Sequence, residues 1–317
     1  MISERLKGRS LLTWLDFTSD EVQLFLNMSK QIKGEKQRGE IHRRFTGKTL
    51  ALLFEKLSTR TRCSFETAFG EEGGYPVFLG KDDIHLGVKE SLEDTARVLG
   101  RMFTAIEFRG YKQSTAETLA KFSGVPVYNG LTDDFHPTQA LADMLTIDEN
   151  FGGVHGRKLC FVGDGRNNTV RSLMVIGAKL GLNLFVITPK SLYPNPAFLD
   201  ECSELAKNTG GSITVSSEIS AVKNADAIYT DVWASMGEES KREERIKLLK
   251  PYQVNQALMD KSGRKDTIFM HDLPAIKGEE VTANVIDGPQ SKAWDQAENR
   301  KHTIKAIMLA TINGTSD

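Results

Sequence analysis

Short apolar runs alternate with helix-like stretches along most of the chain. In the first half, the runs have the length and composition of buried strands, and they span residues 50–54, 76–79, 105–108 and 125–128. Helix-like stretches at 59–69, 91–102 and 114–122 separate them, and each ends near a glycine that can cap a helix. This alternation predicts βαβ units and a parallel sheet.

The second half repeats the alternation. Its strand candidates are residues 158–162, 182–187, 213–216, 227–230 and 267–271, separated by helix-like stretches at 168–180, 196–208 and 217–224. We therefore predict an α/β protein with two domains of similar size, each a parallel sheet flanked by helices. Ligands are expected in the cleft that two such domains form.

Two further helical segments set the predicted domain boundaries. Apolar residues between positions 140 and 147 have amphipathic helical spacing, and this segment stands between the two alternating blocks. The stretch 295–312 is helical again and is expected to pack back on the first domain. The predicted boundaries are 1–136 for the first domain, 137–149 for the interdomain helix, 150–294 for the second domain and 295–317 for the C-terminal helix.

The composition excludes several classes of partner. Among 317 residues, 41 Lys and Arg oppose 42 Asp and Glu, whereas binding to nucleic acid or an anionic membrane favours a surplus of positive charge. The three cysteines lie far apart and form no metal-binding pattern, so we expect no metal. No basic-then-apolar leader opens the sequence, and no run approaches the ~18 apolar residues of a membrane span. The composition favours a reduced, cytoplasmic protein.

The string Phe-Glu-Lys-Leu-Ser-Thr-Arg-Thr-Arg at 54–62 lies between a predicted strand and a predicted helix. Free backbone N–H groups and the positive end of the helix dipole attract anions at such a turn. Hydroxyls at Ser58, Thr59 and Thr61, with the two arginines Arg60 and Arg62, are typical of a phosphate cradle. The alternative is an ordinary Ser/Thr helix cap followed by solvated arginines.

A second group of polar residues suits a ligand that carries an ammonium group and a carboxylate. Asp231, near Ser235 and Met236, offers one carboxylate, a hydroxyl and backbone groups, which suits an ammonium group better than a second carboxylate. Asn167 and Asn168 precede a predicted helix, where their amides and the helix dipole can hold an α-carboxylate. A plain asparagine helix cap is the alternative.

The sequence Gly163-Asp164-Gly165 after a predicted strand is only weakly suggestive of a dinucleotide fold. No third glycine follows at the fingerprint position, and Arg166 would crowd the turn. We therefore expect no nicotinamide cofactor and interpret the glycines as turn residues.

Seven motifs in order along the chain resemble those of the aspartate/ornithine carbamoyltransferase family. They are Ser58-Thr59-Arg60-Thr61-Arg62, Phe108-Arg109-Gly110, Phe135-His136-Pro137-Thr138-Gln139, Gly163 to Asn168, Thr230 to Gly237, His271-Asp272-Leu273-Pro274 and Asp295 to Arg300. The resemblance covers essentially the whole chain. The Asn-Asn and Ser-Met-Gly elements are similar to the ornithine branch of the family.

The resemblance implies transfer of a carbamoyl group from carbamoyl phosphate to the side-chain amine of ornithine, without a cofactor. It also implies a homotrimer, or a multiple of trimers, with shared sites. The implied carbamoyl phosphate ligands are Ser58, Thr59, Arg60, Thr61, His85, Arg109, His136, Gln139 and Arg300. The implied ornithine ligands are Asn167, Asn168, Asp231, Ser235, Met236, Asp272 and Leu273. The implied catalytic residues are Arg109, His136, Asp231, Asp272 and Arg300.

Two positions depart from the family pattern. Ornithine enzymes usually carry cysteine at Asp272, and an aspartate there puts two carboxylates near one ammonium group, which favours a protonated Asp272 or a second positive group on the acceptor. The family commonly has glutamine at His85, which adds positive charge near phosphate if it is protonated. Another acceptor, such as putrescine or lysine, and a non-catalytic ligand-binding paralogue therefore remain alternatives.

Spacing alone does not decide the roles of two arginines and one charged segment. Arg109 at a strand end, and Arg300 on a charged helix, are equally typical of surface arginines without the resemblance. The charged segment 238–245, which follows Ser235 and Met236, is expected to be a loop that closes over the acceptor.

Overall fold

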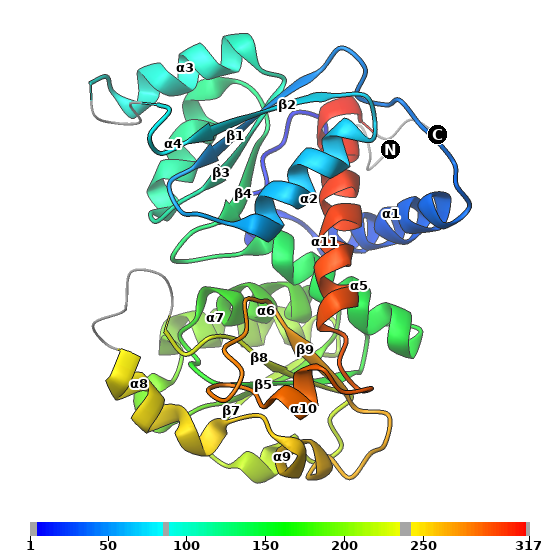
Figure 1. Cartoon of the computed structure of the whole chain (residues 1–317), viewed down its shortest axis with the longest axis vertical. Coiled ribbons are helices and arrows are strands. Elements are labelled where there is room, and N and C mark those ends of the chain that lie inside the picture. The colour runs from blue at the N-terminus through cyan, green and yellow to red at the C-terminus, as the bar shows by residue number, and fades with distance from the viewer. Residues whose placement is uncertain (1–4, 85–88, 235–241, 315–317) are drawn as a thin grey trace. The chain divides into compact units, whose positions relative to one another are not determined.

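The computed structural model describes residues 5–84, 89–234 and 242–314. The chain divides into two compact units, the first made of Met1–Leu145 with Glu298–Asp317 and the second of Thr146–Ala297. Each unit contains one parallel sheet flanked by helices (Figure 1), which confirms the predicted fold class. None of the described helices is long and apolar enough to cross a membrane.

The first unit is built on a sheet with the strand order β2-β1-β3-β4. Its strands are β1 (Thr49–Phe54), β2 (Tyr75–Gly80), β3 (Ala105–Arg109) and β4 (Val127–Leu131). Its helices are α1 (Ser19–Gln37), α2 (Thr59–Gly70), α3 (Leu92–Met102), α4 (Gln113–Ser123), the first part of α5 (Pro137–Phe151) and most of α11 (Ala293–Met308), which a π-helical turn (Leu309–Asn313) extends. A short 3-10 helix (Trp14–Asp16) precedes α1.

The two faces of this sheet have different partners. Alternate residues such as Leu53 and Phe108 join a buried cluster with residues of α3 and α4. On the opposite face, the ring of Tyr128 lies 6.2 Å from that of Phe65 in α2, and its hydroxyl is 2.7 Å from Thr311 Oγ1, after α11. Arg109 pairs with Phe54 and lies on this second face, with α2 and α11.

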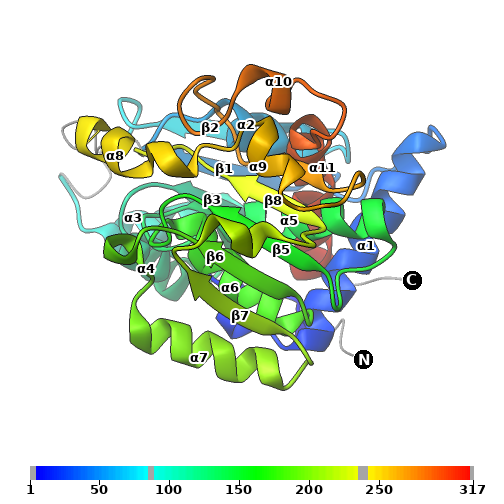
Figure 2. The same ribbon diagram turned by 90° about the horizontal axis from the view of Figure 1, so that it is seen from below.

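The second unit has a five-stranded parallel sheet with the order β7-β6-β5-β8-β9, seen from below in Figure 2. Its strands are β5 (Lys158–Val162), β6 (Asn183–Ile187), β7 (Ser212–Ser216), β8 (Ala227–Thr230) and β9 (Ile268–His271). Its helices are α6 (Asn168–Lys179), α7 (Pro196–Lys207), α8 (Arg242–Leu249), α9 (Gln256–Asp260) and α10 (Ala283–Ile286), with 3-10 turns at Lys190–Leu192, Ile219–Val222 and Lys250–Tyr252. Apolar side chains from its strands and from α8, α9 and α10 join one buried core cluster.

Two segments differ from the sequence prediction in the type or position of the element. The strand expected at 125–128 is β4, which begins two residues later. The helix expected over 217–224 is only a 3-10 turn at Ile219–Val222, which lacks a side-chain cap and is followed by Asn224 in the left-handed region, φ 61°. A single turn without a cap has too few hydrogen bonds to extend into an α-helix.

Four of the described α-helices, namely α1, α8, α9 and α10, lie where the sequence analysis predicted none. Helix α1 begins with a capping box, in which Thr18 Oγ1 accepts from the N–H of Glu21 and Glu21 Oε2 accepts from the N–H of Thr18. The segment 238–245 was expected to be a loop, but from Arg242 onward it is helix α8, whose first turn carries Glu243 and Glu244 at the favourable end of the dipole. Residues 235–241 lie outside the described residues.

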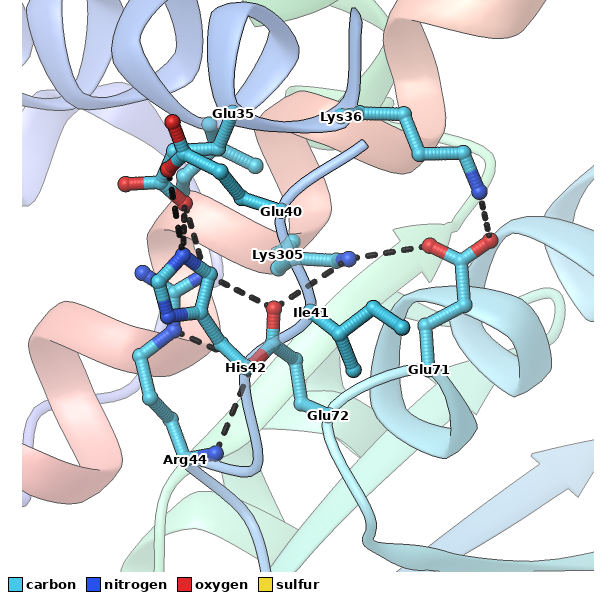
Figure 3. A pocket seen from close by; sticks show the side chains of 10 residues that line it. Glu35, Lys36, Glu40, Ile41, His42, Arg44, Glu71, Glu72 and Lys305 are labelled. Atoms are coloured by element: carbon cyan, nitrogen blue, oxygen red, sulfur yellow. Dashed lines mark hydrogen bonds and ion pairs between the residues drawn. The ribbon is translucent and has the colours of Figure 1, made fainter. Parts of the chain in front are cut away.

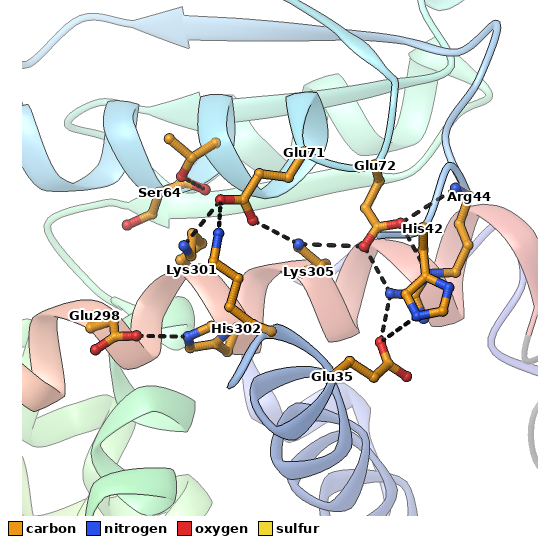
Figure 4. A network of polar contacts seen from close by, with 12 residues as sticks. Glu35, His42, Arg44, Ser64, Glu71, Glu72, Glu298, Lys301, His302 and Lys305 are labelled. Atoms are coloured by element: carbon orange, nitrogen blue, oxygen red, sulfur yellow. Dashed lines mark hydrogen bonds and ion pairs between the residues drawn. The ribbon is translucent and has the colours of Figure 1, made fainter. Parts of the chain in front are cut away.

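An ion-pair network holds α11 against the C-terminal end of α2 in the first unit (Figure 4). Glu71 binds Lys36, Lys301 and Lys305, with N···O distances of 2.8, 3.2 and 2.9 Å. Burial opposes the ionisation of Glu71, but hydrogen bonds from Lys36 and Lys305 outweigh it and lower the pKa to about 2. Lys301 and Lys305 therefore fix α11 against the end of α2, and Lys36 ties α1 to the same carboxylate.

A cavity of about 140 Å³ lies beside this network (Figure 3). Its main charged groups are already bound to one another, since Arg44 lies 2.8 Å from Glu35 and 2.7 Å from Glu72, and Lys305 contacts both Glu71 and Glu72. We interpret this cavity as a structural junction of α1, α2 and α11.

We expect Gly100→Ala to destabilise the protein. Helices α3 and α4 approach each other so closely that a Cβ at Gly100 would lie 1.8 Å from the carbonyl oxygen of Ser123. Overpacking of this kind costs about 1–3 kcal/mol. The urea-unfolding midpoint, followed by circular dichroism, should fall. Gly70→Ala in α2 is the control, because its Cβ meets no atom within 4 Å. It should leave the midpoint unchanged or raise it, and equal midpoints for the two variants would contradict the packing argument.

Candidate active site

The first group of predicted site residues lies at the carboxyl ends of β1 and β3. In the order β2-β1-β3-β4, the chain leaves β1 toward one edge of the sheet and β3 toward the other, and ligands of open α/β sheets bind at such a switch point. The turn after β1 is tied to the end of β3, because the N–H of Glu55 donates to the carbonyl oxygen of Arg109 at 2.8 Å. The start of α2 is thereby held beside Arg109.

The start of α2 both caps the helix and offers donors to an anion. Ser58 is extended, with φ −161°, and its Oγ accepts from the N–H of Thr61 at 3.1 Å. The other N–H groups of the first turn have no partner within the helix, and their partial positive charge adds to that of Arg60. Helix capping and anion binding are therefore compatible here.

Thr61 is the centre of the first group. Its Oγ1 accepts from Arg109 Nη1 at 3.0 Å and from Arg300 Nη2 at 2.7 Å. The exposed fractions of Arg109 and Arg300 are 7% and 2%, so neither is the solvated surface arginine that spacing alone allowed. Two buried guanidinium groups that share one hydroxyl acceptor would be stabilised by a bound anion.

His136 and Gln139 add a donor and an acceptor to this group. Burial lowers the pKa of His136 well below its usual range, and the cations Arg300, Arg109 and Arg60 lower it further. The imidazole is therefore neutral and can donate a single N–H. Gln139 Nε2 donates to Asp143 Oδ1 at 2.8 Å, whereas its Oε1 is buried and accepts no hydrogen bond from the described residues. A donor and an acceptor on one helix turn suit a group with adjacent carbonyl and amide functions.

The second group lies in the second unit, at the carboxyl ends of β5, β8 and β9. These strands are neighbours, and the order β7-β6-β5-β8-β9 places its switch point between β5 and β8. Asn167 Nδ2 donates to Asp231 Oδ2 at 2.9 Å, while its Oδ1 accepts from the N–H of Thr169 at 2.6 Å. Asn167 therefore caps α6 and orients Asp231 at the same time.

Asp231 and Asp272 form a buried pair of carboxyl groups. Each is 8% exposed, and Thr169 Oγ1 donates to Asp272 Oδ2 at 3.4 Å. Burial and the neighbouring Asp272 raise the pKa of Asp231 to about 6. A cation between the two carboxyl groups would offset both the burial of Asp231 and its repulsion by Asp272. The carboxyl ends of these strands are therefore suited to an ammonium group.

The turn after β9 holds Asp272 in place. His271 Nδ1 accepts from the N–H of Leu273 at 2.8 Å, so the proton of the neutral ring lies on Nε2, which is 3.1 Å from Glu280 Oε1. Leu273 is half-buried and has φ 65°. Neither His271 nor Glu280 was a candidate from sequence, and no motif or regular spacing connects the two.

The structure places the predicted residues in two groups. The first unit brings together Ser58, Thr59, Arg60, Thr61, Arg109, His136, Gln139 and Arg300. The second unit brings together Asn167, Asn168, Asp231, Asp272 and Leu273. The candidates His85, Ser235 and Met236 lie outside the described residues. Asp143 was missed, although its i+4 spacing from Gln139 was a usable signal.

Comparison with known proteins identifies the family to which both units belong. The family profile of the "Aspartate/ornithine carbamoyltransferase, carbamoyl-P binding domain" matches residues 9–149, and that of the "Asp/Orn binding domain" matches residues 155–311. The chain belongs to the aspartate/ornithine carbamoyltransferase family.

Individual relatives match over nearly full length. An ornithine carbamoyltransferase of Caldanaerobacter subterraneus subsp. tengcongensis is 62% identical, covering 97% of this chain and 98% of its own. A protein of Staphylococcus aureus named as a catabolic ornithine carbamoyltransferase is 55% identical, with 97% of each chain covered. The structure of the Pyrococcus furiosus ornithine carbamoyltransferase has a TM-score of 0.94 at 46% identity, covering 98% of this chain and 99% of its own.

The raised pKa of Asp231 predicts how stability depends on pH. Its folded pKa of about 6 lies above the ordinary value of 3.8, so its ionisation favours the unfolded chain. The stability of the wild type relative to Asp231→Asn should therefore be highest below about pH 4, fall by up to about 3 kcal/mol as the pH rises to about 6, and then stay constant. Urea-unfolding free energies measured across this range test the prediction.

Asp266→Asn is the control for this measurement. A hydrogen bond from Arg264 lowers the pKa of the exposed Asp266, so its contribution should be constant above about pH 5. A difference between wild type and Asp231→Asn that is flat from pH 4 to pH 7 would show that Asp231 titrates normally.

Proposed function

We propose that the protein transfers the carbamoyl group of carbamoyl phosphate to the side-chain amine of L-ornithine, giving L-citrulline and phosphate. The observation that carries this proposal is the buried Thr61 hydroxyl with Arg109 and Arg300 at the start of α2, a charged anion site in a member of this family. The names and the nearly full-length match of the relatives support ornithine as the acceptor.

The first group of residues would bind carbamoyl phosphate. Hydroxyls and backbone N–H groups of Ser58, Thr59 and Thr61 bind the phosphate oxygens, together with Arg60 and Arg109. His136 donates its N–H to the carbonyl oxygen, and Gln139 Oε1 accepts from the amide. These last two roles follow from the neutral state of His136 and the vacant acceptor of Gln139. Arg300 adds charge at the carbonyl end, and His85 is assigned to the phosphate of a neighbouring subunit.

The second group would hold the α-amino-acid end of ornithine. Asn167 and Asn168, at the start of α6, bind the α-carboxylate. Asp231 and Asp272 bind the α-ammonium group, whose positive charge favours the ionised form of Asp231. Backbone groups at Leu273, with Ser235 and Met236, complete the contact. The side-chain amine is then left to react.

The reaction needs positioning and charge stabilisation. The unprotonated amine attacks the carbonyl carbon, a tetrahedral intermediate forms, and the bond from carbon to the phosphate oxygen breaks while the leaving phosphate takes the proton of the amine. Arg109, His136 and Thr61 stabilise the oxyanion. Each well-placed donor contributes roughly 10²–10³ in rate.

The finer assignments are part of the same proposal. Residues 1–136 bind the phosphate donor, residues 150–294 bind ornithine, the helix at 137–149 links these domains, and the segment 295–317 packs back on the first domain. We assign the protein to the cytoplasm, to a homotrimer or a multiple of trimers, and to arginine biosynthesis. Since the Staphylococcus aureus relative is named catabolic, both directions of the reaction are to be measured.

An acceptor panel tests the activity. Carbamoyl phosphate is supplied with ornithine, lysine or putrescine, and the ureido product and phosphate are measured together. Equal amounts of both, with the highest kcat/KM for ornithine, are expected. A preference for lysine or putrescine would contradict the assignment of ornithine, and the absence of product with every amine would indicate a ligand-binding paralogue.

The same panel on Asp272→Cys shows what Asp272 contributes. We expect ornithine to remain the best acceptor and its KM to rise, because one of two carboxylates facing the ammonium group is lost. A change of preferred acceptor would instead make Asp272 a determinant of substrate choice.

Arg60→Ala tests the phosphate cradle. Loss of one charged donor should lower kcat/KM for carbamoyl phosphate by roughly 10²–10³. Arg62→Ala is the matched control, because Arg62 binds Glu66 at 3.0 Å and lies 3.7 Å from the centre of the Phe78 ring. It should keep near-normal turnover. Near-normal turnover of Arg60→Ala would remove Arg60 from the cradle.

A further inference from the structure

Glu107 carries a fully buried carboxyl group that the proposed mechanism does not use. It lies in the middle of β3 and is 0% exposed. Neither carboxyl oxygen accepts a hydrogen bond from any residue in the described part of the chain. Burial of an ionised, unpartnered carboxylate is among the most costly arrangements in a protein, so this residue requires an explanation.

The position of Glu107 connects it to the anion site. It is two residues before Arg109 on the same strand, so both side chains lie on the same face of the sheet. Gly130 is the extra residue of a bulge in β4, and a Cβ there would lie 1.9 Å from Glu107 Oε1 and 3.0 Å from Thr61 Cγ2. The carboxyl group thus fills the space that this glycine leaves beside Thr61.

The charged groups around Glu107 are the two arginines of the cluster. Burial raises the pKa of Glu107 well above its usual range, and the opposing effects of Arg109 and Arg300 are smaller. Its register partners on the adjacent strands, Leu52 of β1 and Tyr128 of β4, carry no charge at neutral pH. His136, near the same arginines, is also neutral.

We propose that Glu107 is a positioning residue whose carboxyl group, buried without a hydrogen bond beside Thr61, stays neutral behind Arg109 and Arg300. This inference rests on the proposed function, in which the two arginines bind the phosphate donor. A neutral Glu107 leaves their full charge to the ligand, whereas an ionised Glu107 competes with phosphate for it. Phosphate binding in alkaline solution must therefore return a proton to Glu107.

Calorimetric titration with inorganic phosphate tests this linkage on the intact protein. The wild-type Kd is measured at rising pH up to about pH 10; once Glu107 ionises, it should rise and approach a tenfold increase per pH unit, with uptake of about one proton per phosphate. Paired titrations in two buffers of different ionisation enthalpy measure the uptake. Glu107→Gln, which is always neutral, should bind phosphate like the wild type at pH 8, keep that affinity to pH 10 and take up no proton.

Glu66→Gln is the control, because Glu66 is a partly exposed carboxylate on α2 that binds Arg62. It should show the same alkaline loss of affinity as the wild type. A role of Glu107 in packing alone would lower affinity equally at every pH and leave no difference in proton uptake. Equal alkaline losses in wild type and Glu107→Gln, or a constant wild-type affinity up to pH 10, overturn the inference.

Infrared spectroscopy supplies a readout that does not need a folded variant. The carbonyl stretch of a buried protonated carboxyl group should be present in the wild type at neutral pH and disappear over the range in which phosphate affinity falls. Its absence at neutral pH overturns the inference. If wild-type protein binds no phosphate at pH 8, the proposed phosphate site fails together with this inference, whereas unlinked titration overturns the role of Glu107 alone.

Discussion

The first unit depends on one hydroxyl group that accepts hydrogen bonds from two buried arginines. Thr61, Arg109 and Arg300 come from α2, β3 and α11, so this contact joins three segments that are distant in sequence. Two like charges on one oxygen repel each other in a poorly solvated place. The ion-pair network around Glu71 fixes α11 to α2 and stabilises the arrangement before an anion is bound.

The second unit also brings like charges together in a buried place, but there the charges are negative. Asp231 and Asp272 follow neighbouring strands, and their mutual repulsion, added to burial, makes Asp231 a weak acid. Polar neutral partners, Asn167 and Thr169, hold the two carboxyl groups without cancelling their charge. In both units, charged side chains of one sign lie at a switch point of a parallel sheet. The strand ends hold these side chains in place, and a ligand of opposite charge would reduce their mutual repulsion.

Much of this arrangement follows from sequence. Alternating strand and helix patterns predict two parallel sheets, and the Ser58 to Arg62 string predicts an anion site because hydroxyls and arginines follow a strand directly. Local spacing does not reveal burial, so it cannot show that the side chain of Arg300 is buried and donates to Thr61. Glu107 cannot be predicted as a buried group for the same reason, because a charged residue within a strand is unusual only when helices cover both faces of the sheet. Helix α1 is predictable as well, because Thr18 and Glu21 have the spacing of a capping box.

The ionisable groups around the arginines explain how a protein with net charge −1 concentrates a local positive field. His136 is kept neutral by burial and by the same cations that it accompanies, so it contributes a directed N–H without adding repulsion. The cations act on Glu107 in the opposite sense and favour its ionisation, but burial prevails and the carboxyl stays neutral. Both outcomes leave Arg109 and Arg300 as the charged groups at the centre of the site. Because low solvation strengthens every uncompensated charge, the site gains selectivity for an anion from its neutral groups as well as from its arginines.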